Sequence, residues 1–162
     1  MIEPNFNQKQ ELARDLIRYY LSARRGLTEL GILRSERSLQ SDYADWLAVE
    51  LLALQLNTNP VEDAGATDRT GCTYHIRSHI VEDLQQAASF DFDSLPAPFD
   101  YLVGVLFSVD LDVLAVLLIP YKVVCELGRQ SDSEFRVPWN RQTAAHPQIE
   151  KILWKDDSNM VY

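Results

Sequence analysis

The chain has 162 residues, of which 46% are hydrophobic and 24% are charged, and its formal net charge is −9. This length fits a single domain with its own core, and the composition is that of an ordinary globular protein. The charge excludes a chain-wide basic surface for nucleic acid. Residues 41–127 are the acidic part, with fourteen Asp or Glu against three Lys or Arg.

Three further features of the sequence predict a cytoplasmic protein. The N-terminus lacks the basic and then apolar order of a signal peptide. The most apolar stretch, residues 101–121, carries Asp110 and Asp112 at its middle, which argues against a membrane span. Cys72 and Cys125 suit a reducing compartment and have no metal-ligand spacing.

A helix is predicted over residues 8–30. Its apolar side chains recur at steps of three and four residues, which is the period of an amphipathic helix. Asn5 or Asn7 is available as the N-cap, and Gly31 marks the end. The apolar residues at these steps are Leu12, Leu16, Ile17, Tyr20, Leu21 and Leu27.

A second helix is predicted over residues 41–54. Ser41 is its expected N-cap, and Asp42 and Asp45 in the first turn complement the helix dipole. The rest of this segment is nearly all apolar, which indicates burial on more than one side.

The period then changes to that of strands. Residues 64–79 predict a hairpin around a turn at Asp68–Gly71, and residues 99–119 predict a second, buried hairpin in the same sheet. The polar and acidic residues 81–98 between the hairpins are interpreted as a surface loop.

A short helix is expected from Pro120, at its first position, to Leu127. The tail, residues 128–162, is expected to have a strand-like start and a short last helix, and Trp139 should be at least half buried. We therefore predict one α/β domain, residues 1–162, with a mixed sheet flanked by helices. In it, a helical region (1–40) precedes a core (41–127), and the tail packs on that core.

Four segments in a fixed order carry a resemblance to a known family. They are SDYADWLAVELL, NPVEDAGATDRTG, TYHIRSHI and FDYLVGVLF. Together they resemble small restriction-endonuclease-like proteins of the PD-(D/E)XK superfamily over about residues 27–127. A weaker similarity continues at Arg136 to Arg141. The resemblance implies a restriction-endonuclease-like fold and, in an active member, a DNA endonuclease that uses Mg²⁺ or Mn²⁺.

The family's site residues carry over only in part. Its helical carboxylate corresponds to Asp45, which is still acidic. Its central aspartate corresponds to Gly65, which has no side chain. Its Q-I-K strand segment corresponds to His75, Ile76 and Arg77, so the lysine has become an arginine that cannot act as a general base. Catalytic roles would therefore fall to Asp45, His75 and Arg77, in a site that is degenerate.

The resemblance leaves more than one assignment for the metal ligands and for the nucleic-acid contacts. Asp63 and Asp68 flank the missing carboxylate and could join Asp45 as ligands. His75 suits Zn²⁺ or Mn²⁺ better than Mg²⁺. The basic residues are either phosphate contacts or a solvated surface, and an ordinary polar strand face would equally explain His75 and Arg77. The candidate phosphate contacts are Arg34, Arg37, Arg136 and Arg141.

Two functions from different classes follow. The first is a nuclease-fold protein with weak or no catalytic activity, associated with duplex DNA in bacterial defence or mobile elements, a setting that the resemblance implies. The second is a non-catalytic, acidic protein-interaction module on the same fold, either as a homodimer or with another protein partner. The acidic middle of the chain favours the second, whereas Asp45 and Arg77 favour the first.

Overall fold

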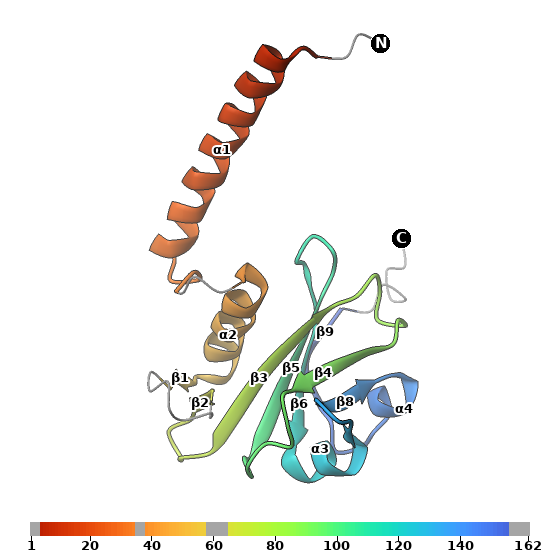
Figure 1. The fold of residues 1–162 in the computed structure, drawn as a ribbon. Coiled ribbons are helices and arrows are strands. Elements are labelled where there is room, and N and C mark those ends of the chain that lie inside the picture. Colours follow the sequence, from red (N-terminus) through yellow and green to blue (C-terminus); the bar gives the residue numbers. More distant parts are fainter. Residues whose placement is uncertain (1–3, 35–37, 58–64, 156–162) are drawn as a thin grey trace, which may run out of the picture. The chain divides into compact units, whose positions relative to one another are not determined.

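The structure is a computed structural model that describes residues 4–34, 38–57 and 65–155 (Figure 1). The chain divides into two compact units, residues 1–43 and 44–162. The helices are α1 (Phe6–Glu29), α2 (Leu39–Leu52), α3 (Tyr121–Leu127) and α4 (Arg141–Ala144). The strands are β1 (Gln55–Leu56), β2 (Ala66–Thr67), β3 (Thr73–Ile80), β4 (Ala88–Phe92), β5 (Tyr101–Phe107), β6 (Val113–Pro120), β7 (Arg129–Gln130), β8 (Phe135–Trp139) and β9 (Glu150–Trp154).

The helix predicted over residues 8–30 is confirmed as α1. Asn5 is its N-cap, in a capping box in which Asn5 and Gln8 each accept a hydrogen bond from the other's backbone N–H. The helix ends before Gly31, whose φ of +78° suits glycine. No residue of α1 is buried.

The second predicted helix is present as α2, but its N-terminus differs from the prediction. The helix begins at Leu39, and the Ser38 hydroxyl accepts a hydrogen bond from the backbone N–H of Ser41 at 3.2 Å. Ser41 is therefore not the N-cap, because Ser38 offers the same hydroxyl three residues earlier. Ala44 and Ala48, one turn apart, are buried.

Both predicted hairpins are confirmed, and they belong to one six-stranded sheet with the order β1-β2-β3-β5-β6-β9. β2 and β3 pair antiparallel around a turn that ends at Gly71, with φ +88°. β5 and β6 form the second antiparallel hairpin. β3 and β5 pair in parallel, so the sheet is mixed.

A second sheet, with the order β4-β8-β7, was not predicted. The expectation that residues 81–98 form a loop is wrong over β4, which pairs with β8. The signal lies in a short alternation: Phe90 and Phe92 are buried, whereas Asp91 between them is exposed. Because acidic residues surround this short alternation, the sequence of the segment is typical of a surface loop.

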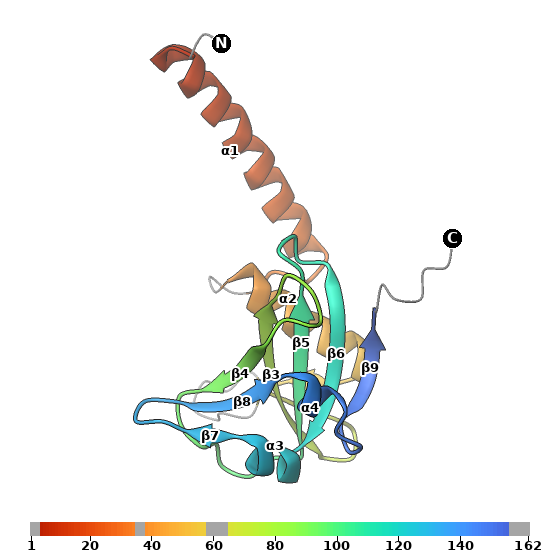
Figure 2. The same ribbon diagram turned by 90° about the vertical axis from the view of Figure 1, so that its right-hand side faces the viewer.

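The main core lies between the two sheets. Figure 2 shows β4, β8 and β7 in front of β5 and β6, and residues 44–52 of α2 behind them. Trp139 of β8 is only 1% exposed, which confirms its predicted burial. The core cluster is Val81, Phe90, Phe92, Phe99, Leu102, Leu106, Ala115, Leu117, Ile119, Val123, Val124, Phe135, Val137, Trp139 and Ile149.

The C-terminal region differs from its prediction in two ways. Pro120 ends β6 and is the N-cap of α3 rather than its first helical residue. The expected last helix is reduced to the four residues of α4, and a strand, β9, follows it and pairs with β6. The tail thus supplies strands to both sheets.

The architecture is mixed α/β, as predicted, with helices and two sheets in the same chain. Among the helices that the structure describes, none has both the length and the apolar character needed to cross a membrane.

Candidate functional site

The predicted catalytic strand, β3, presents two different faces. His75 and Arg77 lie beside Leu102 and Gly104 of β5 in the parallel register. Paired residues in a sheet point to the same side, and Leu102 belongs to the core between the sheets. The side chains of His75 and Arg77 therefore point toward the second sheet. An ordinary solvated strand face does not describe them.

His75 is enclosed by aromatic rings. Its side chain is 4% exposed, and the centroid of its imidazole lies 4.6 Å from that of Phe99 and 5.7 Å from that of Phe92, both in edge-on contacts. Such edge-on contacts are a favourable geometry for aromatic pairs in a core. The geometry around His75 is thus that of a packed interior residue.

Arg77 joins β3 to β4. Its Nε donates a hydrogen bond to the carbonyl oxygen of Asp91 at 3.0 Å, and its Nη1 donates to the carbonyl oxygen of Ile76 at 2.9 Å. The guanidinium carbon lies 4.4 Å from the centroid of the Phe92 ring, a cation–π distance. The planar, multiply donating guanidinium suits these contacts, which a lysine could not reproduce.

Both carboxylate oxygens of Asp68 accept hydrogen bonds from residues of the first hairpin. Its Oδ1 accepts hydrogen bonds from the backbone N–H groups of Thr70 and Cys72 and from the Thr70 hydroxyl, at 2.7 to 3.0 Å. Its Oδ2 accepts from the Tyr74 hydroxyl at 2.9 Å. The pKa of Asp68 lies below its ordinary value of 3.8, mainly because the Thr70 hydroxyl donates a hydrogen bond to the carboxylate. Burial, together with the bond to Asp68, raises the pKa of Tyr74.

Gly65, at the position of the missing carboxylate, lies against the backbone of β3. A Cβ atom there would meet the carbonyl oxygen of Tyr74 at 3.2 Å, and the Gly65 carbonyl oxygen accepts a hydrogen bond from the Asn57 backbone. A larger side chain would have to displace this neighbour slightly.

The predicted catalytic residues are only partly brought together. The structure places His75 and Arg77 side by side under β4, whereas Asp45 comes from α2, on the other side of the six-stranded sheet (Figure 2). Asp63 lies outside the described residues. Within residues 4–34, 38–57 and 65–155, no three His, Cys, Asp or Glu side chains converge as a metal site requires.

The predicted phosphate contacts have different surroundings. Arg136 on β8 forms an ion pair with Glu134 at 2.6 Å and lies 3.7 Å from Asp91, so carboxylates already neutralise its charge. The backbone N–H of Arg34 donates to the buried Asp42 carboxylate at 3.1 Å. Arg37 lies outside the described residues. Arg141 begins α4 and is exposed.

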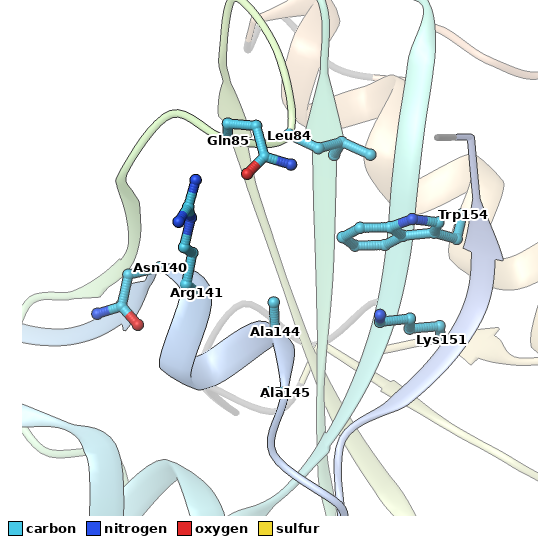
Figure 3. Close-up of a pocket in the computed structure, with 8 residues that line it drawn as sticks. All are labelled: Leu84, Gln85, Asn140, Arg141, Ala144, Ala145, Lys151 and Trp154. Carbon is cyan, nitrogen blue, oxygen red and sulfur yellow. The ribbon is translucent and has the colours of Figure 1, made fainter. Parts of the chain in front are cut away.

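Arg141 borders a hollow of about 310 Å³ (Figure 3). A second basic residue also lines this hollow. Lys151 of β9 lies across the hollow from Arg141, with its Nζ 4.1 Å from the centroid of the Trp154 ring. Both charged residues of the lining are therefore basic. The lining consists of Leu84, Gln85, Asn140, Arg141, Ala144, Ala145, Lys151 and Trp154.

A β-bulge explains how Lys151 and Trp154 reach the same hollow. Residues three apart on a regular strand point to opposite faces. The register between β6 and β9 shifts here, with Val116 opposite Leu153 but Leu117 opposite Lys151. The extra residue, Ile152, turns Lys151 back to the face of Trp154. Sequence reasoning missed both residues, because this segment lacks a regular two-residue alternation.

Comparison with models of known protein families and with characterised proteins gives no match for this chain.

Proposed function

We propose that this chain is a non-catalytic protein of restriction-endonuclease-like fold that acts as a protein-interaction module. The observation that carries the non-catalytic part of this proposal is the environment of Arg77. The side chain at the position of the family's lysine holds two strands together and stacks on Phe92. A group committed in this way is poorly placed to contact a scissile phosphate.

The other site positions support the same conclusion. Gly65 provides no carboxylate, and both oxygens of Asp68 accept hydrogen bonds within the turn. His75 is packed among aromatic rings. Magnesium requires several carboxylate or carbonyl oxygens and bound water in near-octahedral geometry. Of the candidate ligands that the structure describes, this leaves Asp45, and one carboxylate would hold Mg²⁺ too weakly for a millimolar concentration to fill the site.

The fold assignment is supported by the order of the elements. A helix precedes the short β2–β3 hairpin, and the strand of the lysine position lies inside a mixed sheet, next to the buried β5–β6 hairpin. This is the arrangement that the resemblance of the sequence segments implies. The acidic charge of residues 41–127 favours a protein partner over DNA, because it repels phosphates.

The direct test is a cleavage assay on duplex DNA at low salt, with Mg²⁺ and with Mn²⁺ in turn. We expect no cutting above background, since loss of one well-placed electrostatic group costs a factor of about 10²–10³ in rate. These losses need not multiply, because such groups act as a unit.

The matched variant in this assay is Asp45→Ala. Robust cutting by the unmodified chain that Asp45→Ala abolishes would overturn the non-catalytic assignment. Cutting that survives Asp45→Ala would instead come from a contaminating nuclease, and a second purification would remove it.

Association with duplex DNA is a second candidate function, and the hollow beside α4 favours it. Arg141 and Lys151 are two cations placed to meet phosphates from either side. Fluorescence anisotropy with labelled duplex DNA at low salt tests this. Arg141→Ala should weaken binding and lower the salt slope by about one unit. Arg136→Ala is the matched control, because Glu134 already pairs with that side chain.

A further inference from the structure

The surface of α1 carries a second regularity besides its amphipathic pattern. Along the helix and its C-cap residue, Leu30, eight residues follow one another at alternating steps of three and four, and seven of them are apolar. This spacing is the heptad pattern of a helix that packs along its length against another helix. We call these residues the α1 seam: Phe6, Lys9, Ala13, Leu16, Tyr20, Ala23, Leu27 and Leu30.

The positions around the α1 seam fit the same pattern. Glu11, Arg18 and Arg25 lie on the side of the helix opposite the seam, where a heptad keeps its charged residues. Leu12, Ile17 and Tyr19 flank the seam and widen its apolar surface.

Among residues 4–34 and 38–43, the part of the first unit that the structure describes, nothing covers this surface. Phe6 is 76% exposed, Leu16 57% and Tyr20 62%, and α1 has no buried residue. A helix in water derives most of its stability from packing of its apolar face. A 24-residue helix with this many exposed apolar side chains is therefore incomplete without an occupant of the seam.

The α1 seam is complementary to itself when a second copy runs in the opposite direction. Its eight positions are symmetric about Arg18, so reversal places Leu16 opposite Tyr20 of the second copy and Ala13 opposite Ala23. Lys9 then faces Leu27. In a parallel pair the two Lys9 ammonium groups would meet within the seam, which is unfavourable.

The surface available is sufficient for a stable dimer. Phe6, Tyr19 and Tyr20 are each aromatic, and such side chains bury about 150–250 Å² apiece. Six such rings in two helices, with the flanking leucines, therefore reach the roughly 1,000 Å² that a specific interface requires.

From this self-complementarity we infer that two copies of the chain associate through α1, as an antiparallel helix pair. The inference rests on the proposed interaction function and names its partner as a second copy of this chain. It involves none of the predicted catalytic residues, so a failed nuclease assay and a failed dimerisation assay are separate results.

Sedimentation of the full chain at about 10–100 µM is the first test. We expect a dimer of the 18.5 kDa chain, and we expect Leu16→Asp and Tyr20→Asp each to give a monomer with its second unit still folded. Ser22→Asp introduces the same residue outside the α1 seam and should remain a dimer. A monomeric unmodified chain, or a dimer that persists in both seam variants, overturns the inference.

Orientation is tested with both native cysteines replaced by serine and a short thiol cross-linker. In the antiparallel pair, Ala13→Cys chains or Ala23→Cys chains alone should give little covalent dimer, whereas an equal mixture of the two should give a strong band. Efficient cross-linking of each variant alone would show a parallel pair and overturn the antiparallel assignment.

Discussion

The β5–β6 hairpin and α1 both carry many apolar side chains and use them in opposite ways. From Leu102 to Phe107 every residue of β5 is buried, and Leu102 and Leu106 belong to the core between the two sheets. No residue of α1 is buried. Apolar side chains on the hairpin are buried within the chain. Those on α1 stay exposed and need a packing surface from outside the first unit to become buried.

This contrast separates two kinds of substitution. Changes in the core of the second unit should alter the free energy of unfolding directly, since close packing leaves little room for relaxation. Changes along α1 should alter association and leave the second unit folded.

Trp139→Ala should lower the free energy of unfolding by about 3–5 kcal/mol. Trp139 is nearly fully buried and contacts the ring of Trp154, at 5.9 Å between centroids. Urea denaturation followed by circular dichroism measures the change. Leu95→Ala removes a side chain that is 52% exposed and should change stability by at most about 0.5 kcal/mol. Equal effects of the two variants would contradict the packing described for the second sheet.

Arg77→Ala should cost about 1.5–3 kcal/mol, the range for hydrogen bonds that involve a charged group. The loss comes from the bonds to the carbonyl oxygens of Asp91 and Ile76 and from the stacking on Phe92. Arg18→Ala, on the side of α1 opposite the α1 seam, is the matched control and should leave the same transition unchanged. An Arg77→Ala protein of full stability would argue that this guanidinium is free for a ligand instead.

Gly104→Ala and Gly26→Ala place the same methyl group in the two regions. At Gly104 the new Cβ would lie 2.6 Å from the Phe90 ring, and overpacking of this kind costs about 1–3 kcal/mol. At Gly26 nothing lies within 4 Å, so alanine should strengthen α1 by up to about 1 kcal/mol through helix propensity. Thermal unfolding measures the first effect, and the far-ultraviolet ellipticity of α1 measures the second.

The sequence predicted those parts of the fold that have strong local signals. The three- and four-residue steps of α1, and the turn ending at Gly71, depend on few distant contacts, and both were predicted correctly. β4 was missed because its alternation covers only five residues within an acidic stretch. β9 was missed because a bulge at Ile152 breaks its period.

The candidate site was harder to predict than the fold, for a related reason. The identity of Arg77 could be compared with a family pattern, but its surroundings are supplied by Asp91 and Phe92 of β4. With that segment interpreted as a loop, no sequence argument could place a ring or a carbonyl oxygen against the guanidinium. The same holds for the hollow, since Arg141 of α4 and Lys151 of β9 both border it only because the folded chain brings these two elements near one another.

The smallest predicted effect concerns acid stability at the first hairpin. The pKa of Asp68 is lowered from 3.8 chiefly by the hydrogen bond from the Thr70 hydroxyl. A carboxylate with a lowered pKa in the folded state contributes stability above pH 3.8, and this contribution is lost as the pH falls through the folded-state pKa. Asp68→Asn should therefore be less stable than the unmodified chain at neutral pH, and the difference should shrink below about pH 4.

Thr70→Ala isolates the cause of that shift. It removes the hydroxyl donor while the backbone N–H groups of residues 70 and 72 still bond to Asp68, so the pKa should move partway back toward 3.8. Titration of the Asp68 carboxyl carbon by nuclear magnetic resonance measures the pKa in both proteins. If Asp68 already titrates at or above 3.8 in the unmodified chain, its carboxylate is not held by these hydrogen bonds, and it becomes available as a substitute for the metal ligand that the family resemblance places at Gly65.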